Sequence, residues 1–397
     1  MGVSDQLNSK AGSSSLLDKV MRASLNFALS TVLLAGSALG QADVHNDENG
    51  NVFLSGKDAI AHKDLFEKEG VFRTDYPLAS GAYSAFKCYK NSSPNIDIET
   101  YFVMDADTGD ILLDHGGHLK IQPASMTKLM TALLVHEAIE DGFDPNTLLY
   151  VSEVQADARD YDDKILFKPN IREKLGTYIR AFDADQAALI GSYNDAAFLL
   201  AENVAKFRGI GNSETAFVGL MNTKAEEIGM ENTVFYNSNG MPLSHAVVSG
   251  EGLGSTTGDF VTLLREIDTK HDDLMDIMGM TAANLRLGKG RKDITSSNSL
   301  VKRVDLLPFD EVAGKSGATC NTGLAATMRF DQGDKSIYIS YVGGRSWYDR
   351  EQRMTQIAER AFEKIDENRA RLEAYAESEL HDQTILSCPE CADFDLH

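Results

Sequence analysis

The stretch Pro123-Ala124-Ser125-Met126-Thr127-Lys128-Leu129-Met130-Thr131 carries a serine hydroxyl and a lysine amine three residues apart, at the predicted start of a helix. Residues three apart lie on one face of a helix, so the Lys128 amine can reach the Ser125 hydroxyl. A lysine amine that has lost its proton can activate a serine without histidine. The helix predicted from Ser125 to Glu140 is apolar over much of its circumference, which is typical of a core helix.

Two further motifs are needed to single out this serine-lysine pair, because Ser-x-x-Lys also occurs at Ser84 and Ser299. Ser192-Tyr193-Asn194 follows in the middle of the chain, and Lys315-Ser316-Gly317 follows near its end. The order Ser-x-x-Lys, Ser-x-Asn, Lys-[Ser/Thr]-Gly is typical of serine enzymes that interact with penicillin. Other Ser-x-Asn copies exist, whereas Lys-[Ser/Thr]-Gly occurs only once. The series predicts a nucleophilic serine that forms an acyl-enzyme.

Around these motifs the sequence resembles the D-alanyl-D-alanine carboxypeptidase family of low-molecular-weight penicillin-binding proteins, serine peptidase family S11. The resemblance covers roughly residues 100 to 362. The matching blocks are Met104-Asp105-Ala106-Asp107-Thr108-Gly109 with Ile111-Leu112, Pro-Ala-Ser-Met-Thr-Lys at 123–128, Ser192-Tyr193-Asn194-Asp195-Ala196-Ala197, Met221-Asn222 through Gly240, and Gly314-Lys315-Ser316-Gly317-Ala318-Thr319. The resemblance implies a serine-type carboxypeptidase that trims the stem pentapeptides of peptidoglycan, with β-lactam antibiotics as covalent inhibitors and no cofactor.

Within this resemblance, Ser125 is expected to attack the carbonyl of a D-Ala-D-Ala peptide bond and to release D-alanine, after which water cleaves the ester. Lys128 is the expected base. An exposed lysine is protonated at neutral pH, so this role requires burial and a neighbouring cation such as Lys315 to lower the pKa of Lys128. Ser192 is expected to pass a proton to the leaving amine, and Asn194 to bond the substrate backbone or the lysine.

The third motif is expected to bind substrate. Lys315 is predicted to pair with the terminal carboxylate, and Ser316 and Thr319 to add hydroxyl donors. Gly317 lets the strand backbone approach the substrate closely. The backbone amides of Ser125 and Ala318 are the expected donors to the oxyanion.

The sequence departs from the family pattern at two of these positions. Tyr193 stands where the family usually has glycine, which suggests a narrower cleft or an aromatic wall. Ser316 replaces the more usual threonine and keeps the hydroxyl. Asn298 matches a family segment before the third motif and is interpreted as structural. The intervals 169–192 and 244–257 are longer than is usual and are expected to alter access to the site.

Several other functions compete with the carboxypeptidase. A class A β-lactamase needs a glutamate with an asparagine four residues on, and the corresponding segment 225–232 lacks that spacing, so slow penicillin turnover is expected. A DD-endopeptidase that cleaves peptide cross-links and a non-catalytic peptidoglycan-binding or scaffold protein stay open. A nucleotide-binding loop is excluded because Phe309 stands where its first glycine is required.

No metal site is predicted. His136-Glu137-Ala138-Ile139-Glu140 imitates a zinc-protease helix but has glutamate in place of the second histidine. The Asp105, Asp107 and Asp110 spacing resembles a calcium loop, but a turn explains it better because a ligand position is Gly109. Four cysteines suit one or two disulfides in an exported protein, and the sequence does not choose among their pairings: Cys88, Cys320, Cys388 and Cys391.

Composition and the N-terminal segment indicate which partners and which cellular location to expect. The chain has 397 residues, 43% of them hydrophobic, and a formal net charge of −22, which argues against nucleic acid and anionic lipid as partners. Residues 1–42 have the form of a signal peptide, with Lys10, Lys19 and Arg22 before an apolar run. The protein is therefore expected to be exported to the bacterial periplasm or cell envelope, with membrane contact only if that segment is uncleaved.

The remaining organisation is predicted as a polar N-terminal extension (43–98), a DD-peptidase catalytic domain (99–365) and a charged C-terminal helix and tail (366–397). Residues 101–104 and 111–113 are predicted strands, as are 312–320, 324–330 and 337–342. The part between them is predicted to be mainly helical. Strands from both ends of the domain indicate an α+β fold, with one antiparallel sheet flanked by helices and a helical subdomain.

Overall fold

The computed structural model describes residues 43–46, 52–55, 99–151, 176–241, 254–319 and 323–386. The chain divides into two compact units, residues 1–79 and 80–397. In the first unit, strands β1 (Asp43–Asn46) and β2 (Val52–Ser55) pair antiparallel. The predicted signal segment, the side chains of all four cysteines, and residues 169–175 and 244–253 of the two long intervals lie outside the described residues.

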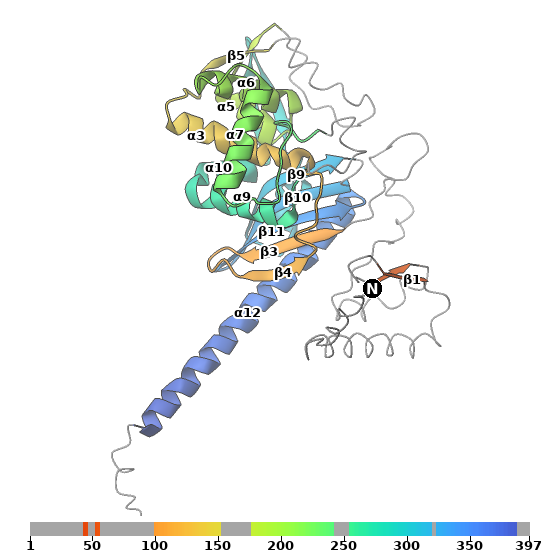
Figure 1. Cartoon of the computed structure of the whole chain (residues 1–397), viewed down its shortest axis with the longest axis vertical. Helices are drawn as coiled ribbons and strands as arrows, with labels where there is room; N and C mark the ends of the chain where they lie inside the picture. The colour runs from red at the N-terminus through yellow and green to blue at the C-terminus, as the bar shows by residue number, and fades with distance from the viewer. Residues whose placement is uncertain are drawn as a thin grey trace, which may run out of the picture. The chain divides into compact units, whose positions relative to one another are not determined.

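The second unit is built on a five-stranded antiparallel sheet, drawn in orange and blue in Figure 1. Its strands, in spatial order, are β4 (Ile111–His115), β3 (Thr100–Asp105), β11 (Lys335–Gly344), β10 (Gly323–Gln332) and β9 (Glu311–Thr319). These strands confirm the predicted ones and the α+β fold class. β9 lies at one edge of the sheet.

The turn between β3 and β4 confirms the turn interpretation of the three aspartates. The Asp105 carboxylate accepts hydrogen bonds from the backbone amides of Asp107, at 2.9 Å, and Thr108, at 3.1 Å. Gly109 has a φ of +77°, a left-handed conformation that suits glycine. The Asp105 carboxylate therefore closes the turn of this hairpin.

Helices cover both faces of the five-stranded sheet. Tyr338 of β11 donates a hydrogen bond to Asp268 of α9 (Thr257–Lys270), so α9 lies on the face to which Tyr338 points. On the opposite face Phe362 of α12 (Trp347–Leu386) packs on Phe309, which in turn contacts Phe330 of β10. The core therefore forms as a helix, sheet, helix sandwich.

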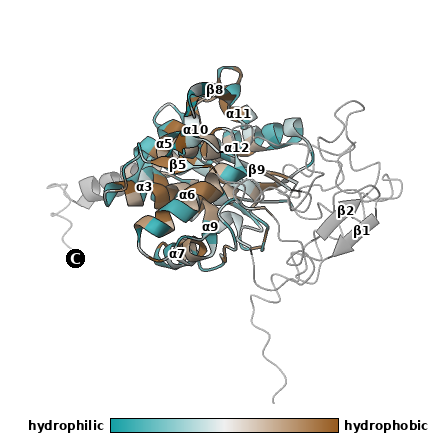
Figure 2. Cartoon of the chain, turned by 90° about the horizontal axis from the view of Figure 1, so that it is seen from above, coloured by the Kyte–Doolittle hydropathy of each residue, from teal (hydrophilic) through white to brown (hydrophobic). Residues whose placement is uncertain are grey.

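A helical layer beside α9 carries the first two motifs. It comprises α3 (Lys128–Glu140), α5 (Ala181–Leu189), α6 (Asn194–Phe207), α7 (Glu214–Glu227) and α10 (Asp272–Gly279). Figure 2 shows hydrophobic (brown) and hydrophilic (teal) residues mixed along α5, α6 and α7. α3 differs, because ten of its 13 residues are buried. It therefore forms the central helix of this layer, as the sequence predicts.

The predicted start of that helix is wrong in one respect. Residues Ala124–Thr127 form a short 3-10 helix, η2, and the α-helix begins only at Lys128. Ala124, the first residue of η2, has a φ of +51°, so a right-handed helix cannot extend through it toward the N-terminus. Ser125 therefore sits on a tight turn ahead of the helix.

A second sheet was not predicted, so the expectation of one antiparallel sheet is incomplete. It has four antiparallel strands: β5 (Leu148–Tyr150), β6 (Tyr178–Arg180), β7 (Ala282–Leu287) and β8 (Gly290–Thr295). Two of these strands have only three residues, too few to show an alternating pattern. Two short helical segments, α11 (Ser299–Lys302) and η4 (Val304–Leu306), lead from β8 to β9. Among the described helices, none has the length and apolar character needed to cross a membrane.

His136 ties three helices of the layer together. Its side chain is buried in α3, with Nε2 at 3.1 Å from Asp185 of α5 and Nδ1 at 3.0 Å from Asp273 of α10. Burial opposes protonation, but the hydrogen bonds and charges of the two aspartates outweigh it and raise the pKa of His136. The histidine of the zinc-protease-like segment is therefore engaged in ion pairs.

Replacing His136 with glutamine should destabilise the protein more at pH 5.5 than at pH 9. A raised pKa in the folded state gives stability that is fully present below the unfolded pKa, about 6.5, and is lost as pH rises through the folded pKa. Urea unfolding of both proteins at several pH values measures this. His118→Gln, at an exposed site, is the control and should show no such trend. A pH-independent loss in His136→Gln would contradict the ion-pair account.

Candidate active site

Ser125 and Lys128 meet at the junction of η2 and α3. The Lys128 Nζ lies 2.9 Å from the Ser125 Oγ, as the three-residue spacing predicts. Ser125 is only half-buried and lines a cleft, whereas Lys128 beneath it is completely buried. The arrangement exposes the hydroxyl and hides the amine.

The Lys128 amine has two further hydrogen-bond acceptors. Its Nζ lies 2.7 Å from Oδ1 of Asn194, the first residue of α6, and 2.8 Å from the carbonyl oxygen of Asn239. Burial holds the pKa of Lys128 well below its usual value, and the charge of Lys315 lowers it further, against the opposing effect of Asp195. Both causes match those expected from the sequence.

The three contacts suit a neutral amine. A protonated lysine has three N–H donors and would donate to all three oxygens. After losing a proton, the amine keeps two donors for Asn194 and Asn239, and its lone pair is left to accept the hydrogen of the Ser125 hydroxyl. The geometry that holds Lys128 in place is thus also the geometry of a general base for Ser125.

Ser192 and Lys315 form a second hydrogen-bonded pair in the cleft. Ser192 lies on the turn between α5 and α6 with a φ of +61°, which directs its hydroxyl to the Lys315 Nζ at 2.9 Å. The same amine donates to the carbonyl oxygen of Ser316 at 2.9 Å. Burial first, and then the charge of Arg350, lower the pKa of Lys315 to about 7. Each buried lysine therefore has a serine hydroxyl as a partner.

The structure brings most of the predicted site residues to one cleft of ≈ 540 Å³. The predicted residues that line it are Ser125, Ser192, Asn194, Ser316, Gly317 and Ala318. Lys128 and Lys315 are buried below them through their serine contacts. Thr319 is buried at the end of β9, where it pairs with Gly323, and is not among the described residues that line the cleft.

Two glycines allow the turn at Ser125 to pack closely. A Cβ on Gly317 would lie 3.1 Å from the Ala124 Cβ and 3.2 Å from the Pro123 carbonyl oxygen. A Cβ on Gly240 would lie only 1.6 Å from the Ala124 carbonyl oxygen, and Gly240 itself has a φ of +81°. β9 and the segment that ends at Gly240 thus hold the nucleophile turn between them.

Tyr193 occupies the position where the sequence suggests an aromatic wall. Its side chain lines the cleft, and its ring lies 5.3 Å from the ammonium of Lys292 on β8. Trp347, at the start of α12, lines another part of the cleft. Arg350 lies over the Trp347 ring at 5.0 Å. The cleft therefore has two aromatic residues in its wall.

The sequence motifs do not contain three residues that the structure places at the site: Asn239, Trp347 and Arg350. Asn239 lies within the matching block that ends at Gly240. It acts through its backbone carbonyl oxygen, which every residue has, so its side chain gave no signal. Arg350 is completely buried and donates to the Ala325 carbonyl oxygen at 3.3 Å and to Ser299 Oγ at 2.9 Å. Its position in a strongly charged helix gave no sign of burial.

Asn298 has a structural role, as the sequence suggests. Its side chain accepts a hydrogen bond from the Leu300 amide, which caps α11. Its amide nitrogen lies 2.9 Å from the Met328 sulfur of β10. Among the residues with described side chains, no group of three or more His, Cys, Asp and Glu could hold a metal ion.

The comparison with known families decides the affiliation of this chain. A sequence model of the family described as D-alanyl-D-alanine carboxypeptidase, peptidase S11, matches residues 87–341, more than half of the chain. The chain belongs to this family. The matched range contains all three motifs and every residue that lines the cleft except Trp347.

Individual S11 relatives support the assignment. D-alanyl-D-alanine carboxypeptidase DacF of Bacillus subtilis is 26% identical over 267 residues, which cover 66% of this chain and 62% of the relative. A D-alanyl-D-alanine endopeptidase of Pseudomonas aeruginosa is 31% identical over 164 residues, covering 41% of this chain and 44% of that protein. The chain spans less than two thirds of the length of the first curated S11 carboxypeptidases that it matches.

A solved structure shares the fold. Penicillin-binding protein D2 of Listeria monocytogenes, in its ampicillin-bound form, superposes with a TM-score of 0.53 at 21% identity. The superposition covers 66% of this chain and 96% of that one. The sheet and the flanking helices of this S11 chain therefore belong to a known architecture.

Replacing Gly240 with alanine should lower the free energy of unfolding by ~1–3 kcal/mol, because the new methyl group would overlap the Ala124 carbonyl oxygen. It should also displace the turn that carries Ser125. Gly229→Ala is the matched control, since Gly229 has nearly the same φ, +83°, but nothing within 4 Å of the added Cβ. Denaturant unfolding of both variants measures the difference. Equal losses would show that backbone strain alone, and not packing against Ala124, requires Gly240.

Proposed function

We propose that this chain is a serine-type D-Ala-D-Ala carboxypeptidase that trims stem pentapeptides of peptidoglycan through an acyl-enzyme on Ser125. The observation that carries the proposal is the buried Lys128 amine, 2.9 Å from the Ser125 hydroxyl and with a strongly lowered pKa. Membership of the D-alanyl-D-alanine carboxypeptidase family supports the choice of peptide bond.

Acylation begins when the Ser125 oxygen attacks the carbonyl carbon of the penultimate D-alanine, while Lys128 takes the hydroxyl proton. The backbone amides of Ser125 and Ala318 stabilise the oxyanion, and one such donor is worth roughly 3 kcal/mol. Ser192, hydrogen-bonded to Lys315, returns a proton to the leaving amine, and free D-alanine departs. Water then hydrolyses the ester and regenerates the Ser125 hydroxyl.

Substrate binding uses the edge strand. Among the described strands β9 has only β10 beside it, so β9 leaves one edge open to an extended peptide. Lys315, in its protonated form, attracts the terminal carboxylate, and the Ser316 hydroxyl adds a donor. The expected donor role of Thr319 is not kept, because Thr319 is buried and does not line the cleft. Asn194 bonds the peptide backbone in addition to Lys128.

β-Lactam antibiotics should acylate the same serine, because they present a strained amide and a carboxylate to the same groups. Turnover of that acyl-enzyme should be slow, since the chain lacks the spaced glutamate and asparagine of class A β-lactamases. Peptidoglycan lies outside the cytoplasm, so the function also requires export, for which residues 1–42 are the proposed signal peptide.

An endopeptidase that cleaves cross-links between stem peptides is the second candidate, and the similarity to a Pseudomonas aeruginosa endopeptidase favours keeping it. Both reactions attack a carbonyl of D-alanine. They differ in the leaving group, which is free D-alanine in one and the side-chain amine of a neighbouring stem in the other. The alternative of a non-catalytic peptidoglycan-binding protein is disfavoured by the intact hydrogen bond between Ser125 and Lys128.

The test is mass spectrometry of a peptidoglycan digest that contains pentapeptide monomers and cross-linked dimers, after incubation with the protein or with Ser125→Ala. We expect the pentapeptides to lose one D-alanine with the wild type and to stay unchanged with the variant. Conversion of dimers to monomers would assign the endopeptidase instead. No change in either pool would overturn the enzymatic proposal.

The pH dependence of acylation by a fluorescent penicillin should be bell-shaped. Acylation should rise with pH as Lys128 loses its proton, and fall above pH about 7 as Lys315 loses the charge that attracts the carboxylate. The fall should approach about tenfold per pH unit. Lys315→Arg keeps the charge at all these pH values, so its falling limb should vanish while the rising limb stays. A falling limb near pH 7 in that variant would contradict the role of Lys315.

A further inference from the structure

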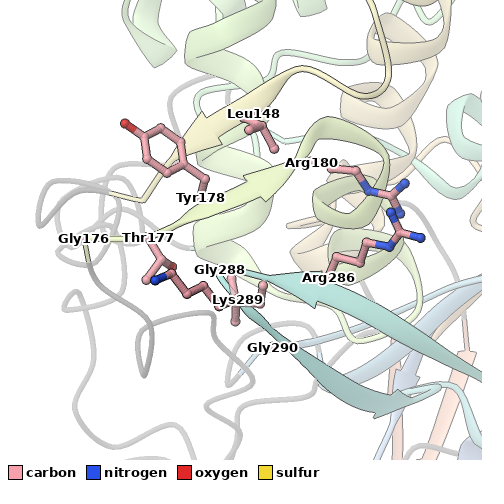
Figure 3. A pocket seen from close by; sticks show the side chains of 10 residues that line it. Leu148, Gly176, Thr177, Tyr178, Arg180, Arg286, Gly288, Lys289 and Gly290 are labelled. Atoms are coloured by element: carbon pink, nitrogen blue, oxygen red, sulfur yellow. The ribbon is translucent and has the colours of Figure 1, made fainter.

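A second depression lies at the tip of the β7–β8 hairpin, away from Ser125. It has a volume of ≈ 680 Å³. Figure 3 shows Arg180 and Arg286 extending to the same side from neighbouring strands, with Tyr178 and Lys289 nearer the tip. Nothing in the proposed reaction uses these residues.

Strand register puts three arginines in a row. Ile179 of β6 pairs antiparallel with Leu287 of β7, so Arg180 and Arg286 are directly opposite each other. On the other side of β7, Arg286 pairs with Arg291 of β8. Side chains of directly paired residues point to the same face, so these three form one cross-strand arginine row. Like charges in such positions repel one another and destabilise a sheet.

Intramolecular contacts leave part of this positive charge uncompensated. Arg180 forms an ion pair with Asp183, and Arg291 donates to the side-chain oxygen of Asn284. The middle arginine, Arg286, and Lys289 at the hairpin tip are exposed and have no hydrogen-bond or ion-pair partner within the described part of the chain. Because the whole chain carries a net charge of −22, this local excess of positive charge is the reverse of its general character.

Aromatic side chains border the arginine row. The rings of Tyr150 and Tyr178 lie 5.4 Å apart on the same face of the sheet, and both residues are half-exposed. Leu148, which pairs with Arg180, is also exposed. Apolar rings beside the free guanidinium of Arg286 suit a ligand that has both carboxylates and apolar faces, such as a peptide or glycan that bears carboxylates.

The arginine row is continuous with the active-site cleft. Asp293, two residues before Thr295 on β8, lines that cleft and accepts a hydrogen bond from the Asn284 amide. Asn284 in turn accepts the hydrogen bond from Arg291. Arg291 precedes Asp293 by two residues on β8. Two residues of a strand span ~7 Å, so Arg291 lies about that far from the rim of the cleft. A ligand a few residues long can bridge the two sites.

We propose that the arginine row and the adjoining depression bind carboxylate groups of the same peptidoglycan polymer whose peptide end occupies the cleft. This accessory site rests on the proposed function, since it extends the contact with that substrate. Arg286 supplies a free guanidinium that pairs with a carboxylate in a bidentate manner. Tyr178 and Tyr150 pack against the rest of the bound polymer. The site selects polymeric substrate over free peptides.

The experiment compares the full chain with Arg286→Glu. Sedimentation with purified peptidoglycan, freed of phosphate-bearing polymers, measures binding. The variant should bind about tenfold more weakly, as expected for loss of a charged hydrogen-bonded pair. Peptidoglycan whose carboxylates have been converted to amides should bind both proteins equally weakly. Arg371→Glu, at an exposed site on α12, is the matched charge control and should bind like the wild type.

Hydrolysis separates this inference from the proposed function. On a short peptide ending in D-Ala-D-Ala with no other carboxylate, wild type and Arg286→Glu should have the same kcat/KM, whereas kcat/KM on the polymer should fall in the variant. Equal losses in Arg286→Glu and Arg371→Glu, or undiminished binding to amidated peptidoglycan, would overturn the accessory site. Failure of the wild type to hydrolyse the short peptide would overturn the proposed function, and sedimentation would still test the arginine row.

Discussion

The buried amine of Lys128 is the constraint on which the rest of the structure depends. A lysine that is removed from water needs hydrogen-bond acceptors, and they come here from three separate segments: Ser125 on η2, Asn194 on α6 and the Asn239 carbonyl. α3, which carries this amine into the interior, is buried on nearly all sides. The geometry that satisfies the lysine also presents it to the serine.

Three buried basic side chains act on one another across the site. Arg350 lowers the pKa of Lys315, and Lys315 lowers that of Lys128. Arg350 is itself completely buried, and its Nε has no hydrogen-bond partner among the residues described. Burial without full compensation destabilises a protein. The site therefore keeps positive charges close together at a cost to stability, as expected where pKa values must be shifted for function.

The sequence predicts the five-stranded sheet and the chemistry of the cleft better than it predicts the framework around them. Ser125, Lys128, Asn194 and Lys315 belong to motifs whose spacing reflects side-chain chemistry. The Asn239 carbonyl carries no such signal, because a backbone oxygen is the same in every residue. The second sheet was missed because β5 and β6 are three residues long and are separated by 27 positions, from Val151 to Thr177, that no pattern connects. Tertiary pairing alone makes them strands.

The long-range pairing of the main sheet has a consequence for folding. β3, near the start of the unit, pairs with β11, and the Tyr341 hydroxyl donates to Glu99 across 242 positions of sequence. Contacts of this range close slowly, because the chain must lose loop entropy before they form. Arg350 lies further along still, so a growing or partly folded chain cannot complete the charge environment of Lys315. The pKa of Lys315, which Arg350 lowers, therefore reaches its final value only when α12 has docked on the sheet.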